Sequence, residues 1–258
     1  MQSINNLSDF KALKEFASKR VPEVQIQYHK NFYRHDVLKY LTRKNCIGIE
    51  LGVAQGHFSK RMIESGKFKK FYGVDLYEDH HDTNEYIKAL NLIGIEEDYV
   101  ILRMSFDEAK DLFDDNYFDF IYFDGYAHTG EEGGKTLNDW YKKLKIGGIY
   151  AGDDYHEDWP LVKWAVNDMV SQLNYKLNVT GIVENNNLNR YPSWFFKKEN
   201  EGIFSTNEQL KELGTLIRNN TRTQINNKFN LTINSLKQIL LQVKSQQPSI
   251  AEDLKKIL

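Results

Sequence analysis

Residues 47–59 read IGIELGVAQGHFS, and this stretch decides the fold. A short apolar run leads into a turn with two glycines and then into an amphipathic segment, which predicts a strand, a tight turn and a helix. Gly52 and Gly56 allow the backbone to turn sharply and to approach a ligand closely. The spacing differs from G-x-G-x-x-G and no P-loop lysine follows, so a dinucleotide or a nucleoside triphosphate is not favoured. Glu50, two residues before the first glycine, suits a cationic ligand better than a pyrophosphate.

From Asn45 onward, short apolar runs alternate with longer amphipathic segments. The alternation predicts an α/β fold with a mostly parallel sheet and helices on both faces. Strands are expected near Cys46–Leu51, Phe71–Asp75, Val100–Leu102, Phe118–Phe123, Gly148–Gly152, Tyr175–Val183 and Tyr191–Lys197. Helices are expected at His57–Ser65, Asn84–Ile93, Ser105–Leu112, Gly133–Leu144 and Pro160–Val170. The polar loop between the last two strands predicts an antiparallel hairpin at the end of a seven-stranded sheet.

Helical extensions are expected on either side of this core. Two helices, Ser8–Lys19 and Tyr28–Thr42, precede it, and a helix with one apolar face follows it. The sequence therefore divides into an N-terminal helical cap or lid (1–44), a ligand-binding domain (45–200) and a C-terminal helical extension (201–258). The extension could pack as an ordinary helix, cap the domain or form a homodimer contact, and the sequence leaves these roles open.

The composition narrows the partners. The 34 basic and 36 acidic residues give a net charge of −2, so no overall field favours nucleic acid or an anionic membrane. The single cysteine, Cys46, excludes an internal disulfide and a cysteine-rich metal site. The N-terminus lacks a basic segment followed by an apolar run, and no stretch is long enough to span a bilayer. We therefore expect a cytoplasmic protein with a small-molecule partner.

Asp75 ends the second expected strand, about 20 residues beyond the glycine turn, where ribose hydroxyls would lie. An aspartate there could also cap a helix or a turn. Together with Glu50 and the glycine turn, Asp75 resembles the first motifs of class I S-adenosylmethionine-dependent methyltransferases, a Rossmann-like fold whose sheet ends in such a hairpin. The resemblance implies that Gly52 and Gly56 line the methionine part of the cofactor and that Asp75 holds its ribose. The implied cofactor-binding residues are Glu50, Gly52, Gly56, Asp75, Ser105 and Phe106.

Ser105 and Phe106 enter that set because they match positions that border the adenine. Phe106 has an alternative role as a core residue of the helix that follows it.

Two further stretches, residues 119–128 (DFIYFDGYAH) and 144–155 (LKIGGIYAGDDY), bring carboxylates to the carboxyl edge of the expected sheet. Open α/β sheets bind ligands at this edge, and neighbouring strands would bring Asp124, Asp153 and Asp154 together. Three carboxylates without a local basic cluster repel one another, and a hard divalent cation such as Mg²⁺ is the usual way to hold them ionised. The sequence therefore predicts a magnesium site.

This pair of stretches resembles the macrocin and novobiocin group of metal-dependent O-methyltransferases over about Cys46–Met169. The resemblance implies that Asp124, Asp153 and Asp154 ligate Mg²⁺, which binds the acceptor oxygen and lowers the pKa of its hydroxyl. The acidic residue and histidine that usually follow the Asp-Gly are displaced here by what looks like a one-residue insertion. The expected catalytic residues are His128 and Asp124. His128 is the first candidate for the general base, because imidazole titrates near neutral pH. Its alternative role is to orient the loop.

The leading hypothesis is an S-adenosylmethionine-dependent and Mg²⁺-dependent O-methyltransferase that acts on a hydroxyl of a small polar acceptor, such as a sugar, a glycan precursor or a natural product. One alternative is metal-independent methylation of nitrogen or of a phosphate or phosphoramidate oxygen. The other is a non-catalytic module that binds S-adenosylmethionine, against which the crowded carboxylates argue. A nucleic-acid methyltransferase is disfavoured by the charge and by the lack of an Asn/Asp-Pro-Pro-Tyr/Phe motif.

Overall fold

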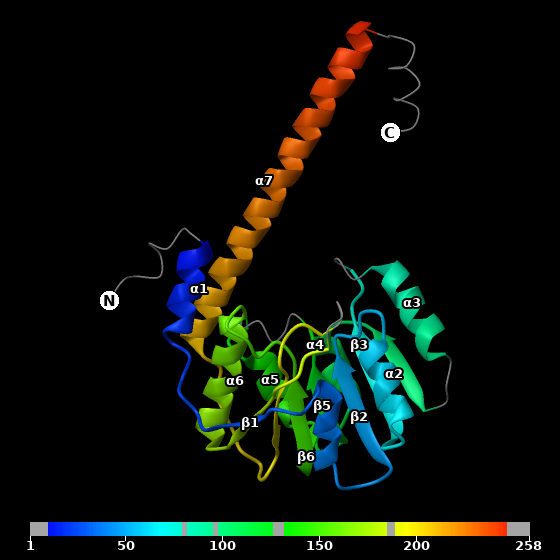
Figure 1. Ribbon diagram of the computed structural model, residues 1–258, viewed down its shortest axis with the longest axis vertical. Helices are drawn as coiled ribbons and strands as arrows, with labels where there is room; N and C mark the ends of the chain where they lie inside the picture. The colour runs from blue at the N-terminus through cyan, green and yellow to red at the C-terminus, as the bar shows by residue number, and fades with distance from the viewer. Residues whose placement is uncertain (1–9, 79–81, 95–97, 126–131, 185–188, 247–258) are drawn as a thin grey trace. The chain divides into compact units, whose positions relative to one another are not determined.

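An eight-stranded sheet forms the centre of the protein (Figure 1). The computed structural model describes residues 10–78, 82–94, 98–125, 132–184 and 189–246. In this part of the chain the strand order is β1-β7-β8-β6-β5-β2-β3-β4. The strands are β1 (Ile26–His29), β2 (Cys46–Leu51), β3 (Phe68–Asp75), β4 (Tyr99–Arg103), β5 (Phe118–Phe123), β6 (Leu144–Gly152), β7 (Leu177–Thr180) and β8 (Trp194–Lys197).

Helices cover both faces of the sheet, as the alternating pattern predicts. The helices are α1 (Phe10–Ser18), η2 (Arg34–Tyr40), α2 (His57–Glu64), α3 (Thr83–Ile93), α4 (Phe106–Ala109), η3 (Lys110–Leu112), α5 (Lys135–Tyr141), α6 (Pro160–Leu173) and α7 (Glu208–Gln246), of which η2 and η3 are 3₁₀ helices. One core cluster joins η2, α2 and α3 to the central strands through Leu38, Phe58 and Ile93. On the other face the α5 ring of Trp140 lies against Phe118.

The strand order reverses between β2 and β5. The chain moves outward from β2 to β3 and β4, and then returns to place β5 and β6 on the other side of β2. All neighbouring strands run parallel except β8, which is antiparallel to both β6 and β7. The Rossmann-like α/β fold with a C-terminal antiparallel hairpin is thus confirmed. Such a reversal opens a crevice at the carboxyl ends of the two central strands, where ligands bind.

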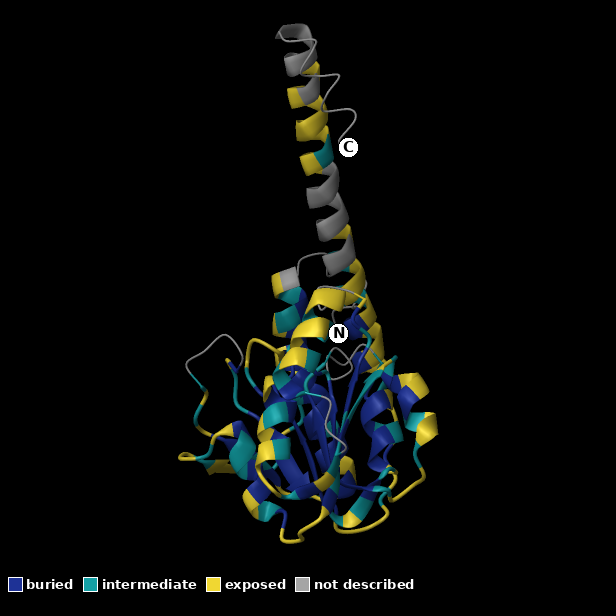
Figure 2. Ribbon diagram, turned by 90° about the vertical axis from the view of Figure 1, so that its right-hand side faces the viewer, coloured by how far each residue is buried: buried dark blue, intermediate teal, exposed yellow. Residues whose placement is uncertain are grey.

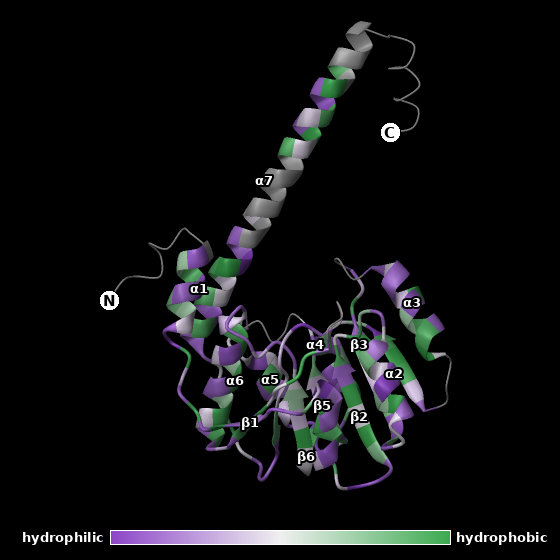
Figure 3. Cartoon of the chain, in the orientation of Figure 1, coloured by the Kyte–Doolittle hydropathy of each residue, from purple (hydrophilic) through white to green (hydrophobic). Residues whose placement is uncertain are grey.

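Burial explains why the central strands were predicted most accurately. The bounds of β2 and β5 are those predicted, and all six residues of β5 are buried. A parallel strand covered on both faces reads as a continuous apolar run, which is easily located in a sequence. Figure 2 shows the buried sheet between partly exposed helices, and in Figure 3 the covering helices carry hydrophobic and hydrophilic residues together.

The predicted helix at Tyr28–Thr42 is wrong. Its first part is the edge strand β1, which pairs in parallel with β7 and makes eight strands instead of seven. Its second part is the seven-residue 3₁₀ helix η2. The apolar spacing of Val37, Leu38 and Leu41 has a helical period because these side chains are buried. Pairing of β1 with a strand about 150 residues later in the chain leaves no local sequence signal.

The chain divides into two compact units, Met1–Thr215 and Leu216–Leu258. The second unit contains most of α7, so the helix expected in the C-terminal extension is present. The role of this extension and the predicted domain bounds at 44/45 and 200/201 stay predictions. Within the described residues, no helix combines the length and the apolar character that a bilayer crossing requires.

Lys198, which follows β8, offers a test of how the hairpin is held. Its side chain is fully buried, and Nζ donates to the carbonyl oxygens of Leu144 and Tyr141 at 2.7 and 3.2 Å. We expect Lys198→Met to lower the free energy of unfolding by about 2 kcal/mol, because both acceptors stay buried. Urea unfolding measures this. The exposed neighbour Lys197→Met is the control and should change the value by less than about 0.5 kcal/mol. Equal effects of the two substitutions would contradict the assignment.

Candidate active site

Four loops meet at the carboxyl ends of β2, β3, β5 and β6, and backbone hydrogen bonds join them. The amide of Gly52 donates to Val74 O at 2.9 Å, and that of Asp124 donates to Leu51 O at 2.8 Å. The amide of Asp153 donates to Phe123 O at 2.8 Å. The sheet therefore continues for one residue into the loops after β2, β5 and β6, which places Gly52, Asp124 and Asp153 on neighbouring positions.

Gly52 is fixed by a close approach between backbones. Its φ is +102°, and a β-carbon at this position would lie 2.1 Å from the carbonyl oxygen of Asp124. No side chain fits there, because backbone cannot give way as the end of a flexible side chain can. Gly56, with φ +83°, is the N-cap of α2, and its β-carbon would lie 2.8 Å from Ile93 Cδ1. The turn predicted from its glycines is thus packed from both sides.

Asp75 holds the glycine turn in place. Its Oδ2 accepts hydrogen bonds from the amides of Val53 and Ala54, both at 2.9 Å, and its Oδ1 accepts one from Tyr77 N at 3.1 Å. Ala54 has a φ of +46°, a strained conformation for a residue with a side chain. Asp75 stabilises it by binding its amide. The ribose contact predicted for Asp75 remains a prediction, and the structure adds this positioning role.

Glu50 points into the protein interior. Only 1% of the residue is exposed, and its carboxylate accepts a hydrogen bond from the hydroxyl of Ser59 on α2. Tyr99 OH in turn donates to Ser59 Oγ at 3.2 Å. Burial raises the pKa of Glu50 well above its usual range; the hydrogen bond from Ser59 opposes this shift and the charge of Asp124 adds to it. The cofactor contact predicted for Glu50 is untested.

The two residues predicted to border the adenine begin helix α4. Ser105 is its N-cap, and its Oγ accepts a hydrogen bond from Glu108 N at 3.2 Å in a capping box. The Phe106 side chain is buried against Gly125, where an added β-carbon would lie 2.8 Å from Phe106 Cζ. Phe106 therefore has the core role that the sequence left open. The adenine contacts of both residues remain predictions.

Arg34 lies between the two carboxylates that follow β5 and β6. Its Nη1 is 3.1 Å from Asp124 Oδ2 and 3.6 Å from Asp153 Oδ2. The guanidinium carbon is 4.8 Å from the centre of the Phe58 ring. Asp153 is almost fully buried and accepts a hydrogen bond from Ser193 Oγ at 2.9 Å, whereas 28% of the Asp124 side chain is exposed. The site therefore presents Asp124 outward and Asp153 inward.

The magnesium prediction assumed that no basic group lies near these aspartates, and that assumption is wrong. Arg34 reaches them although it lies 90 positions before Asp124 in the chain. Asp154 follows β6 with a φ of +59°, and α6 begins later with Trp159 as its N-cap, so Asp154 does not cap that helix. In the ranges that the structure describes, no three His, Cys, Asp or Glu residues form a group that could hold a metal ion. The predicted ligands thus do not fit Mg²⁺ as a set of three, and the Mg²⁺ requirement remains untested.

Burial raises the pKa of Asp153 well above its usual range, and the nearby charge of Asp124 acts in the same direction. Arg34 and the hydrogen bond from Ser193 oppose the shift. His128, predicted as the general base, lies outside the described residues, so its role remains a prediction. Arg34 is the residue that sequence reasoning missed, and its only signal was its place in an aromatic-rich segment.

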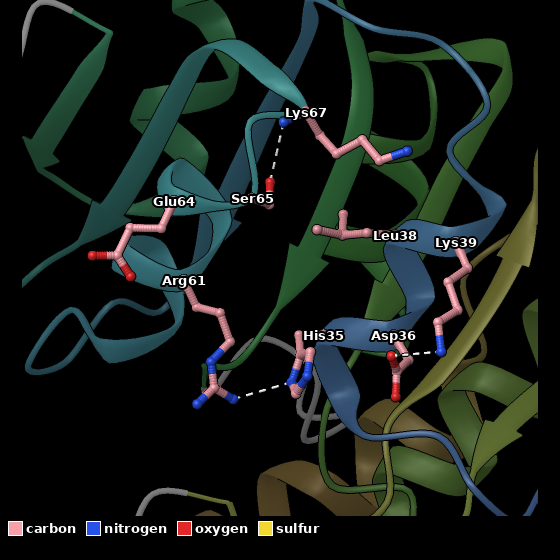
Figure 4. A pocket seen from close by; sticks show the side chains of 8 residues that line it. All are labelled: His35, Asp36, Leu38, Lys39, Arg61, Glu64, Ser65 and Lys67. Carbon is pink, nitrogen blue, oxygen red and sulfur yellow. Dashed lines mark hydrogen bonds and ion pairs between the residues drawn. The ribbon is translucent and has the colours of Figure 1, made fainter.

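A separate pocket lies between η2 and α2 (Figure 4). Its volume is about 520 Å³, and its lining residues are His35, Asp36, Leu38, Lys39, Arg61, Glu64, Ser65 and Lys67. Charges in its wall pair with each other, since Lys39 Nζ is 2.9 Å from Asp36 Oδ1. Figure 4 shows Arg61 directed toward His35, with 3.0 Å between Nη1 and Nδ1. Lys67 directly precedes β3, so this pocket extends toward the opposite edge of the sheet from the glycine turn.

The segment that carries the glycine turn, Asp75, Asp124 and Asp153 matches a known family. Residues 47–155 match the model of a family described as a methyltransferase domain. The match covers less than half of the chain. No curated protein matches the chain.

Three solved structures with a similar fold illustrate the similarity. An S-adenosylmethionine dependent methyltransferase from Mesorhizobium loti aligns with 58% of this chain and 54% of its own, at 17% identity and a TM-score of 0.35. Precorrin 8w decarboxylase from Methanobacterium thermoautotrophicum aligns with 63% of this chain and 86% of its own, at 18% identity and a TM-score of 0.47. An rRNA methylase from Streptococcus thermophilus aligns with 64% of this chain and 94% of its own, at 18% identity and a TM-score of 0.44. The chain spans about half the length of the Mesorhizobium protein and of a match from Listeria monocytogenes (54% and 50%).

The close contact at Gly52 predicts that a substitution there lowers the affinity for the cofactor, an effect that a positive φ alone would not cause. We expect Gly52→Ala to displace the glycine turn and to weaken binding of S-adenosylhomocysteine about tenfold or more, since small displacements of positioning groups are costly. Calorimetric titration measures the affinity. Gly66→Ala is the control, because Gly66 also has a positive φ (+65°) but nothing lies within 4 Å of its added β-carbon. It should cost about 1 kcal/mol of stability and leave the affinity unchanged. Unchanged affinity in Gly52→Ala would contradict the packing argument.

The buried carboxyl of Glu50 predicts a pH-dependent difference in stability. Because its pKa is raised in the folded protein, its stabilising contribution is complete below the unfolded value of about 4.3 and is lost as the pH rises through the folded value. Glu50→Gln keeps a hydrogen-bonding group without the titration. We expect its Tm at pH 8 to exceed that of the wild type by about 3 °C, with the difference vanishing near pH 4. Melting curves across this range test it, and superimposable profiles would show that the charge carries no such cost.

Proposed function

We propose that the protein transfers the methyl group of S-adenosylmethionine to a hydroxyl group of a small polar acceptor, such as a sugar, a glycan precursor or a natural product. The observation that carries this proposal is the position of Asp124. Its backbone contacts the glycine turn at Gly52, and its partly exposed carboxylate lies at the same edge of the sheet. A hydrogen-bond acceptor for a hydroxyl therefore lies beside the turn assigned to the cofactor.

The chemistry asks the chain to position groups rather than to form covalent bonds. S-adenosylmethionine supplies an activated methyl group on its sulfonium. The acceptor oxygen forms a bond to the methyl carbon as the carbon–sulfur bond breaks, which releases S-adenosylhomocysteine. Asp124 accepts a hydrogen bond from the acceptor hydroxyl and so directs its oxygen toward the methyl group. We assign removal of the hydroxyl proton to His128, which lies three residues beyond Gly125, as general base.

The sequence also predicts that methyl transfer depends on Mg²⁺. One observation favours the alternative without a metal. Arg34 contacts the Oδ2 atoms of both Asp124 and Asp153, which are oxygens that a shared ion would bind. Methyl transfer to nitrogen or to a phosphate oxygen remains the second candidate, because it uses the same cofactor turn. Metal chelation during turnover and screening of amine and phosphate acceptors separate these versions. A cytoplasmic location and a small-molecule partner are part of the same proposal.

The assignment of the cofactor turn is tested by binding alone. We expect calorimetry to show saturable binding of S-adenosylmethionine and S-adenosylhomocysteine to the wild type. Asp75→Asn should weaken it about ten- to a hundredfold, the effect of losing a charge-assisted hydrogen bond. Asp119→Asn is the control, since Asp119 also accepts a backbone amide, Ile47 N at 2.9 Å, but at the start of β5. No binding of either ligand to the wild type would overturn the proposed function.

A further inference from the structure

Arg34 is held where the sequence predicts a metal ion. The residue is 4% exposed, and its guanidinium contacts carboxylates from two neighbouring strands while lying against the Phe58 ring. It opens the 3₁₀ helix η2, which is anchored in the core by buried Val37 and Leu38. The position of the guanidinium is therefore fixed by packing in the protein interior.

Resting on the proposed methyl transfer, we infer that Arg34 is the resident cation of the acceptor site and replaces the divalent metal. It balances the charges of Asp124 and Asp153 and fixes the carboxylate of Asp124 toward the acceptor. Arg34 acts through Asp124 and is therefore a positioning residue. The acceptor that such a site recognises is a neutral hydroxyl compound, because the exposed group of the arginine–aspartate cluster is a carboxylate.

The charge balance supports this inference. Asp124 and Asp153 lie next to each other because their strands pair directly, and their like charges repel without a cation between them. A guanidinium stays protonated in proteins and presents several donors in one plane, so one arginine can serve both carboxylates. The Oδ2 atoms of both aspartates already face Arg34. A divalent ion would have to displace a buried side chain to bind both.

The other partners of Asp153 also direct it toward Arg34. Asp153 Oδ1 accepts a hydrogen bond from Ser193 Oγ at 2.9 Å. Ser193 Oγ in turn lies 2.8 Å from the hydroxyl oxygen of Tyr122 on β5. Ser193 and Tyr122 are both buried. These contacts engage one oxygen of Asp153 in the interior and leave the other for Arg34. Asp124, with the more exposed side chain of the pair, is then the member that meets the acceptor.

Metal binding can be measured without turnover. Electron paramagnetic resonance of Mn²⁺ mixed with the wild-type protein should show only free ion at millimolar concentration, with or without S-adenosylhomocysteine. Methyl transfer should be unchanged by a chelator. Stoichiometric binding of Mn²⁺ to the wild type that is lost in Asp153→Asn would overturn the inference. In that case, intact binding of S-adenosylhomocysteine would show that the proposed function still stands.

The positioning role is tested by substitution and chemical rescue. We expect Arg34→Ala to lower kcat about a hundredfold, the typical effect of a misplaced reacting group, without changing the affinity for S-adenosylhomocysteine. Added guanidinium at a concentration too low to denature should restore part of kcat. Arg43→Ala is the matched control, because Arg43 is 3.7 Å from Asp119 with a side chain that is 64% exposed. It should keep its activity and show no response to guanidinium.

Arg34→Lys covers the case in which Arg34→Ala does not fold. Lysine keeps the charge but not the planar fork, so kcat should fall while the affinity for S-adenosylhomocysteine stays constant. Wild-type kcat in a folded Arg34→Lys or Arg34→Ala protein would overturn the inference. A loss of affinity for S-adenosylhomocysteine equal to the loss of kcat would also overturn it, because that result describes a general structural role.

Discussion

A β-carbon on residue 52 would lie 2.1 Å from the carbonyl oxygen of Asp124. The rest of the active site depends on this contact between two backbones. It brings the turn after β2 against the turn after β5, and the two strands are paired over their last four residues. The turn therefore has little freedom, and Asp75 fixes it further through two amide hydrogen bonds. The glycine turn and Asp124 are therefore positioned relative to each other by the main chain.

Bringing these strands together concentrates acidic groups. Glu50, Asp75 and Asp153 are buried, and Asp124 is close to them. Each solves the problem of a buried charge differently. Asp75 accepts hydrogen bonds from three backbone amides. Burial favours the protonated form of Glu50, and Arg34 provides the counter-charge for Asp124 and Asp153. One buried arginine therefore serves the part of the cluster that backbone donors do not reach.

Sequence reasoning succeeded where the signal is local. The bounds of β2 and β5 were predicted because both strands are covered on both faces and read as apolar runs. The glycine turn was predicted because φ values of +102° and +83° at Gly52 and Gly56 favour a residue without a side chain. The neighbourhood of Asp124 and Asp153 followed from strand order. In these cases a residue type and its short-range position were sufficient.

The failures share a different cause. Strand β1 pairs with β7, and Arg34 reaches Asp124 and Asp153, so both depend on contacts between distant parts of the chain. Periodicity reports the burial of Val37 and Leu38 but not which strand the preceding residues join. Along the sequence no basic cluster lies next to the aspartates, because Arg34 is 90 positions before Asp124. Electrostatic interactions depend on distance in space, where Arg34 is close. A metal ion was therefore predicted to balance charges that the chain balances itself.

The integration of the N-terminal segment gives this balance its physical basis. β1 lies on the edge of β7, and the amides of Gly181 and Ile182 donate to His29 O and Phe32 O, both at 3.0 Å. These bonds fix the chain on the N-terminal side of η2, and the buried side chains of η2 fix the other side. Arg34 lies between these two anchors. Displacing its guanidinium from the carboxylates would therefore strain a segment that is paired with the sheet through β1 and packed into the core through η2.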